Sequence, residues 1–207
     1  MDSEMMVEQL FPYLITGNRA SARATAQQIM SSGVTPETLT HEAYWPLLEM
    51  INTLYRNDQL TSLAHHYATR LLRSMVDQAQ ALYTQTNRRN RRVMLFCAET
   101  EADDLAAQIV ADLVEADGYE VFFGGGGVAW DEVMQEATEQ KPDVLLLFFT
   151  EGVSVSKACR AEVHAAARLG RPIIIVRETH HAYGADNFAS LRKRRHVSDS
   201  PWTAVHS

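Results

Sequence analysis

Three things are scarce in this 207-residue chain: cysteine, an excess of basic charge, and long apolar runs. Its two cysteines, Cys97 and Cys159, exclude a disulfide framework and any paired-cysteine zinc or redox site. A formal charge of −7 argues against a general nucleic-acid binder, which needs a basic surface. No apolar run approaches the roughly 20 residues that span a bilayer, and the acidic start does not resemble a signal segment. We therefore expect a cytoplasmic protein that binds neither nucleic acid nor membrane directly.

Charge is distributed unevenly, and this distribution predicts how the chain is divided. Residues 87–92 (NRRNRR) hold four arginines and no acidic residue, whereas residues 93–176 hold 15 acidic and 5 basic residues. Such an arginine run has the composition of an interdomain linker that sits against acidic neighbours. We predict a helical unit over 1–86, this linker, a second domain over 93–180 and a polar tail over 181–207.

Apolar residues at helical spacing dominate the first unit and predict four helices. The boundaries are marked by a turn at Gly17-Asn18 and by Thr35-Pro36, a cap followed by proline at the first helical position. Pro46 lies inside the third helical stretch and should kink or split it, because proline has no N–H to donate. Four amphipathic helices with short connections predict a small four-helix bundle.

Beyond residue 92 the pattern changes to short apolar runs that alternate with helical stretches. The predicted strands are Val93–Cys97, Tyr119–Phe123, Asp143–Phe149 and Pro172–Val176, and the predicted helices are Asp103–Asp117, Trp130–Gln140 and Ser156–Leu169. This alternation predicts an α/β domain of the flavodoxin-like (Rossmann-like) type, with a parallel sheet covered on both faces. Ligands of such sheets bind beyond the carboxyl ends of the strands, where the strand order reverses.

A helical bundle ahead of a flavodoxin-like domain resembles the cobalamin-binding module of corrinoid methyl carriers, methionine synthase and cobalamin-dependent light-sensing repressors. The segment Leu14–Asn18 is similar to the Leu-x-x-Gly-Asp turn of that family, and Pro46 with Ile51–Tyr55 is similar to its Pro-(x)n-Ile-Gly-x-Leu-Trp helix. Eleven residues after that tryptophan the family has a histidine that faces the upper side of the corrin. Here His66 lies eleven residues after Tyr55 and follows His65. The resemblance covers residues 8–176 and implies His66 as a metal ligand, with Tyr55 and His65 in the cofactor site.

The family motif that ligates cobalt from below, Asp-x-His-x-x-Gly, is altered in this chain. Asp103 stands in place of the histidine and Ala106 in place of the glycine. A carboxylate is a hard oxygen ligand and replaces imidazole poorly on cobalt, although carboxylates at a helix start also stabilise the helix dipole. The later Ser-x-Leu becomes Thr150-Glu151-Gly152. The resemblance implies Asp103 and Thr150 at the cofactor site, without the lower histidine.

Four consecutive glycines, Gly124–Gly127, follow the second predicted strand. With Ala129 they fit a Gly-x-Gly-x-x-Ala pattern, in which backbone amides and a helix N-terminus hold phosphate. That pattern normally follows the first strand of its domain, and the acidic residues at the next helix start would repel phosphate. We interpret the run as a loop with room for a planar ring, which places Gly124 and Gly125 in the cofactor site.

The hypothesis that these patterns favour is a non-enzymatic sensory or regulatory protein. It would bind a tetrapyrrole, either haem, a bilin or an atypically held cobalamin, between the bundle and the sheet domain. A protein partner would detect the bound state, as in photoreceptors that regulate transcription. Two alternatives stay open: a corrinoid methyl carrier of a methyltransferase system, and an interaction module without any ligand. The sequence also leaves a homodimer open.

Overall fold

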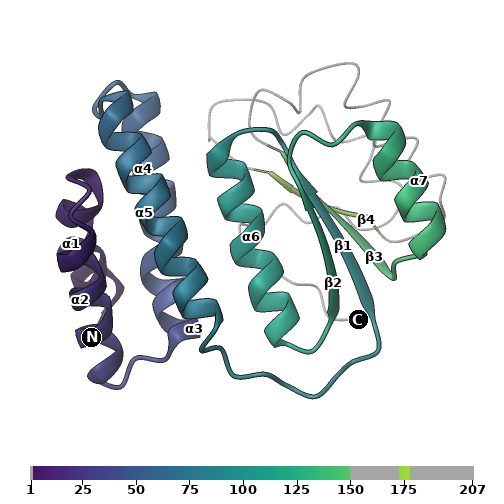
Figure 1. Cartoon of the computed structure of the whole chain (residues 1–207), viewed down its shortest axis with the longest axis horizontal. Helices are drawn as coiled ribbons and strands as arrows, with labels where there is room; N and C mark the ends of the chain where they lie inside the picture. The colour runs from purple at the N-terminus through teal and green to yellow at the C-terminus, as the bar shows by residue number, and fades with distance from the viewer. Residues whose placement is uncertain (1, 150–172, 178–207) are drawn as a thin grey trace. The chain divides into compact units, whose positions relative to one another are not determined.

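The computed structural model describes residues 2–149 and 173–177 (Figure 1). Packing divides the chain into two compact units, with the boundary between Thr86 and Asn87. The first unit is helical and the second contains the sheet. The predicted helix Ser156–Leu169, Thr150 and the predicted tail over residues 181–207 lie outside the described residues.

The helical unit consists of helices, four of which start at a polar cap. The elements are α1 (Ser3–Ile15), α2 (Arg19–Ser31), α3 (Pro36–Leu39), the π-helical turn η1 (Thr40–Tyr44), α4 (Trp45–Arg56) and α5 (Ser62–Gln80). Asp2, Asn18, Thr35 and Thr61 each accept a backbone N–H of the first helical turn. Helix α5 packs against α1 and α4, and its buried stripe runs from Ala68 to Ala79 at helical spacing.

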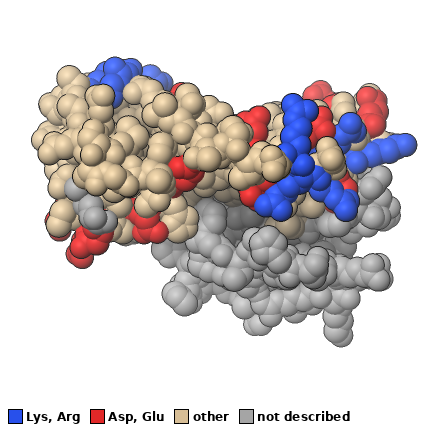
Figure 2. Space-filling view, turned by 90° about the horizontal axis from the view of Figure 1, so that it is seen from below, with Lys and Arg blue, Asp and Glu red and all other residues tan. Residues whose placement is uncertain are grey.

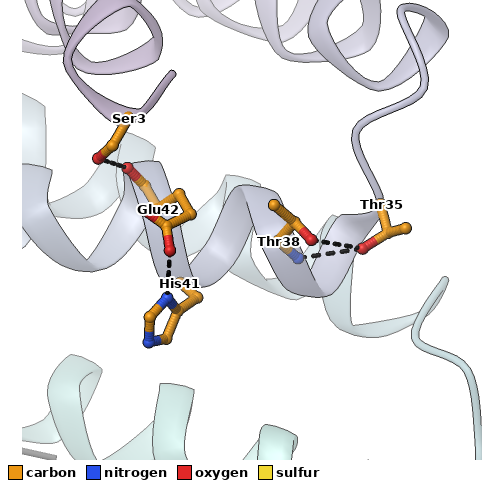
Figure 3. Close-up of polar contacts among 5 residues, drawn as sticks. All are labelled: Ser3, Thr35, Thr38, His41 and Glu42. Carbon is orange, nitrogen blue, oxygen red and sulfur yellow. Dashed lines mark hydrogen bonds and ion pairs between the residues drawn. The ribbon is translucent and has the colours of Figure 1, made fainter. Parts of the chain in front are cut away.

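Pro46 splits the third predicted helix, as expected, but through a wider turn instead of a simple break. In η1 the N–H of Trp45 donates to the carbonyl of Thr40, five residues back. Pro46 has no N–H to offer the carbonyl of Glu42, four residues before it. The hydroxyl of Ser3 donates to that carbonyl, and the carboxylate of Glu42 contacts the ring of His41 (Figure 3). A side chain of α1 thus donates to the carbonyl that Pro46 leaves without its usual helical donor.

The second unit holds a parallel sheet of four strands in the order β2-β1-β3-β4. The strands are β1 (Arg92–Cys97), β2 (Glu120–Gly125), β3 (Val144–Phe149) and β4 (Ile173–Arg177). Each begins and ends within two residues of its predicted range, because the apolar runs are short and well separated. Parallel pairing of β1 with β2 and β3 places the reversal of strand order beside β1.

Helices cover both faces of this sheet, as a doubly wound fold requires. Helix α6 (Glu101–Ala116) packs Ala107 and Ala111 on one face, against Val93 and Leu95. On the other face α7 (Trp130–Gln140) packs against Met94, Phe96, Leu145 and Leu147 through Val133 and Ala137. The two helices lie on opposite sides of the strands in Figure 1. The alternation of side chains along β1 therefore supplies both cores.

The arginine run lies along the amino edge of the sheet, where the strands begin. Arg89 binds Asp117 through Nη2 and Oδ1 at 2.7 Å, and Asp117 raises the pKa of that guanidinium. Arg91 pairs with Asp143 at 2.7 Å and Arg92 with Glu120 at 3.1 Å. Figure 2 shows basic side chains beside acidic ones on this part of the surface. Residues 87–92 thus have acidic partners in their own unit.

Candidate functional site

The carboxyl ends of β1 and β2 are the described part of the edge where doubly wound sheets bind ligands. Residues 98–100 follow β1 and lead into α6, and residues 126–129 follow β2 and lead into α7. These segments contain the predicted site residue Asp103 at the start of α6 and the glycine run at the end of β2. The segment after β3, with Thr150, lies outside the described residues.

Asp103 is part of the cap of its own helix. Thr100 is the N-cap of α6, and its hydroxyl oxygen accepts the N–H of Asp103 at 3.1 Å. The same hydroxyl donates to Oδ2 of Asp103, so hydroxyl and carboxylate hold each other. Asp103 is only 8% exposed. Its carboxylate is therefore directed to the helix start, and the cofactor role predicted for Asp103 remains a prediction.

The glycines of β2 lie against the end of β1 and the loop that follows it. A Cβ on Gly124 would come within 2.2 Å of the Phe96 ring, and one on Gly126 within 2.3 Å of the Ala98 carbonyl oxygen. The pairing of β1 with β2 shifts between Leu95 and Phe96, which leaves Gly124 as an extra residue. Close packing, which the sequence interpretation did not include, explains two of these glycines. The ligand role predicted for Gly124 remains a prediction.

Gly125 and Asp104 form a second close contact at this edge. Gly125 has φ +69°, and a Cβ there would lie 2.9 Å from Oδ1 of Asp104. The thiol of Cys97, at the end of β1, donates to the same oxygen over 3.8 Å. Asp104 therefore contacts the ends of both β1 and β2, and the ligand role predicted for Gly125 remains a prediction.

The other predicted site residues lie in the helical unit and form one fixed pair with an exposed neighbour. The ring of His65 stacks on that of Tyr55, with 4.1 Å between centroids and 21° between planes. His65 Nε2 lies 3.2 Å from Oδ1 of Asn52, which is on α4 one turn before Tyr55. The hydroxyl of Tyr55 is 3.4 Å from that of Ser62. His66, the next residue on α5, has an exposed side chain.

The structure thus brings together Tyr55, His65 and His66 in the helical unit. In the sheet unit Asp103 contacts Thr100, Gly124 lies against Phe96 and Gly125 against Asp104. Sequence reasoning missed Thr100, Asp104 and Asn52 as their partners. The Thr-x-x-Asp pattern at the start of α6 was a readable signal for Thr100. No comparable signal marked Asn52, because its contact depends on the packing of α4 against α5.

The described residues form neither a cluster of metal-ligating side chains nor a membrane-spanning helix. Within residues 2–149 and 173–177, no group of three or more His, Cys, Asp or Glu side chains is placed to hold a metal ion. No helix in the same part of the chain is long and apolar enough to cross a membrane.

Solved structures of cobalamin-binding proteins share the fold of this chain. The monomethylamine corrinoid protein of Methanosarcina barkeri matches with a TM-score of 0.69 at 12% identity, over 96% of this chain and 94% of that one. The fold is that of the cobalamin-binding module, Rossmann-like in its sheet unit.

Two further structures match at lower TM-scores. A cobalamin-binding protein of Desulfitobacterium hafniense matches at 0.48 and 14% identity, over 97% of this chain and 94% of that one. The methanol:cobalamin methyltransferase complex of Methanosarcina barkeri matches at 0.46 and 17% identity, over 94% of this chain and 74% of that one.

Comparison by sequence gives a different kind of result. No curated protein matches the chain. The model of the TIR domain family does match, over residues 77–201. That range is more than half of the chain and includes all four strands of the sheet. This chain belongs to the TIR domain family.

Proposed function

We propose that this chain is a non-enzymatic regulatory protein that binds a tetrapyrrole through the imidazole of His66. The helical unit would serve as the four-helix cap of the cofactor, and a protein partner in the cytoplasm would detect whether the cofactor is bound. A corrinoid is the first choice of tetrapyrrole, because the solved neighbours of this fold are corrinoid and cobalamin-binding proteins. Haem follows as the other metal-containing candidate, and a bilin, which carries no metal, would be held without a bond from His66 to a metal.

The exposed imidazole of His66 beside a fixed ring pair is the observation that carries this proposal. Among the three candidate ligands, His65 is engaged with Asn52 and Tyr55, and Asp103 is engaged with Thr100. His66 differs from both because its ring is presented at the surface. Neutral imidazole suits both cobalt and iron. A bound tetrapyrrole would supply the metal and its colour, and His66 would supply the axial donor.

A set of absorption titrations tests this function. The purified chain is mixed in turn with hydroxocobalamin, haemin and biliverdin, desalted, and examined before and after illumination. We expect one retained chromophore with a shifted band, and for a metal-containing ligand we expect His66→Ala to abolish that shift. His41→Ala is the matched control, because His41 is another exposed histidine of the helical unit. A shift that survives in His66→Ala removes His66 from the site.

An interaction module without ligand is the second candidate. The close approach of Gly124 to Phe96 and of Gly126 to Ala98 supports it, because these segments contact each other directly. A corrinoid methyl carrier is less well supported, since cobalt in such carriers cycles through a highly reduced state and the Asp103 carboxylate is held in a helix cap. The same titrations separate the candidates, because a ligand-free module retains none of the three chromophores.

A further inference from the structure

The segment between helix α5 and strand β1 is bonded at both of its ends and not in its middle. We infer that Gln85–Arg88 is the joint of the chain, about which the helical unit and the sheet unit reorient, whereas Thr84 stays fixed to the first unit and Arg89 to the second. Figure 1 shows neither helix nor strand in this segment. The joint does not depend on a ligand, so it can fail or hold independently of the proposed function.

The amino end of the segment is held by side chains of α3 and η1. Tyr83 is 6% exposed, and its hydroxyl donates to Oγ1 of Thr40 at 2.7 Å. The backbone N–H of the next residue, Thr84, donates to the carboxylate of Glu37. A hydrogen bond to an ionised acceptor is stronger than one between neutral groups. The helical unit therefore holds the chain in one position as far as Thr84.

The carboxyl end of the segment is held by backbone groups as well as by ion pairs. The N–H of Arg89 donates to the carbonyl of Gly118 at 2.8 Å, and its Nε donates to the carbonyl of Asp117 at 2.7 Å. The N–H of Arg92 donates to Oδ2 of Asp143 at 2.9 Å, and the N–H of Asp143 donates back to the carbonyl of Arg92 at 2.9 Å. The sheet unit therefore fixes the chain from Arg89 onward.

The four residues between these anchors lack such bonds. All of Gln85–Arg88 are exposed and belong to no helix or strand. Within the part of the chain that the structure describes, none of them makes a hydrogen bond or an ion pair. Their side chains are polar, so burial of apolar surface does not hold them either. Because nothing offsets the conformational entropy that a fixed backbone loses, we expect these residues to sample many conformations.

The shortness of the joint limits the movement that it allows. Thr84 and Arg89 are five residues apart in the sequence. At roughly 3.6 Å per residue, their Cα atoms can lie at most about 18 Å apart. A tether of this length permits reorientation and excludes wide separation. The joint also begins before the arginine run, so that most of the predicted linker, from Arg89 to Arg92, moves with the sheet unit.

Relaxation of ¹⁵N in the labelled full chain measures the joint directly. We expect order parameters below about 0.6 for the amides of Gln85–Arg88 and of about 0.85 for Tyr83 and Arg92. Hydrogen exchange should be slower at Thr84 and Arg89 than between them, because both amides donate to acceptors of their own unit. The inference is overturned if the order parameters of residues 85–88 equal those of Tyr83 and Arg92.

Insertion of Gly-Ser-Gly-Ser locates the carboxyl end of the joint. After Thr86 the insertion should leave the urea midpoints of both units unchanged, because lengthening an unbonded loop costs little. The same insertion between Asn90 and Arg91 is the matched control. It should lower the midpoint of the sheet unit, because it interrupts the bonded run between Arg89 and Arg92.

NMR signals of α5 and β1, followed through a urea series, report the two midpoints separately. A lower midpoint after the insertion at Thr86 would show that residues 85–88 contribute contacts. Equal midpoints for the two insertions would show that the chain is not fixed from Arg89 onward. Either result overturns the inference, and neither bears on whether a tetrapyrrole binds.

Discussion

The amino edge and the carboxyl edge of the sheet use their charged residues differently. At the amino edge, three arginines reach across the surface to Asp117, Asp143 and Glu120. At the carboxyl edge, carboxylates are drawn into the fold, with Asp103 in a helix cap and Asp104 against Gly125 and Cys97. The first edge is held by exposed ion pairs between side chains. The second is held by short-range contacts that involve the backbone.

This difference teaches where a single substitution matters. Exposed ion pairs contribute about 0.2–1 kcal/mol each, because water and salt screen them. A helix cap contributes about 1 kcal/mol, and an added methyl group in a packed site costs about 1–3 kcal/mol. The stability of the carboxyl edge therefore depends more on packing and helix capping than on its charges. The following predictions test that ranking from its largest member to its smallest.

Gly126→Ala should have the largest effect. We expect it to destabilise the sheet unit by about 3 kcal/mol, because its new methyl group meets the Ala98 carbonyl and cannot avoid it. Gly127→Ala is the control, with φ +74° and only an ordinary contact, 3.9 Å from Cγ of Glu99, and should cost about 1 kcal/mol from backbone strain alone. Native-state hydrogen exchange of the β1 amides measures both. Equal costs would show that contact at Gly126 adds nothing.

Removal of the α6 cap should come next. Thr100→Ala and Asp103→Ala should each lower the free energy of unfolding by about 1 kcal/mol. The double variant should cost scarcely more than Thr100→Ala, because loss of the hydroxyl already removes both hydrogen bonds, whereas Asp103→Ala removes only the one that its carboxylate accepts. Exchange of the amides in the first turn of α6 gives the local readout. Strict additivity would contradict the mutual cap.

Arg91→Ala tests the amino edge. Arg91 and Asp143 are 65% and 32% exposed, so their pair should contribute below about 1 kcal/mol. The loss should shrink further as salt is raised, because ions screen exposed charges. Urea unfolding at low and high sodium chloride provides the comparison. A loss that does not change with salt would mean that Arg91 acts through packing instead.

The smallest expected effect lies in the helical unit, where Glu37 accepts the backbone N–H of Thr84. This hydrogen bond lowers the pKa of Glu37 from its ordinary value of 4.5. Stability from a lowered carboxyl pKa is complete above the unfolded value and is lost as pH falls through the folded one. We therefore expect Glu37→Gln to flatten the acid limb of the stability–pH curve below about pH 4.5. If Glu37→Gln leaves the acid limb of the stability–pH curve unchanged, Glu37 does not contribute to that pH dependence.

Much of the fold could be predicted from local pattern. The four strands follow from short apolar runs, and the interruption at Pro46 follows from its missing N–H. The form of that interruption could not be predicted, because the carbonyl of Glu42 is satisfied by Ser3, which is distant in sequence. No window of neighbouring residues around Pro46 contains that donor, so the π-helical form of the turn was not predicted.

At the carboxyl edge the start of α6 was predictable from the sequence, whereas the contacts of its residues were not. The pattern around residues 99–104 indicated a helix start rich in carboxylates, and α6 does begin there with Thr100 as its cap. The glycine run suggested open space, whereas Gly124 and Gly126 are required by close approach. That approach depends on the register shift between Leu95 and Phe96, which arises only when β1 and β2 are paired.

The interior position of β1 also has a consequence for synthesis on the ribosome. β1 is made before both of its neighbours, and its partner β3 follows only after α6, β2 and α7. Four of its side chains, Val93–Phe96, are buried in the finished sheet. During translation these side chains lack the neighbouring strands that bury them later, because contacts distant in sequence form late. The speed of elongation between β1 and β3 therefore sets how long this strand is open to aggregation.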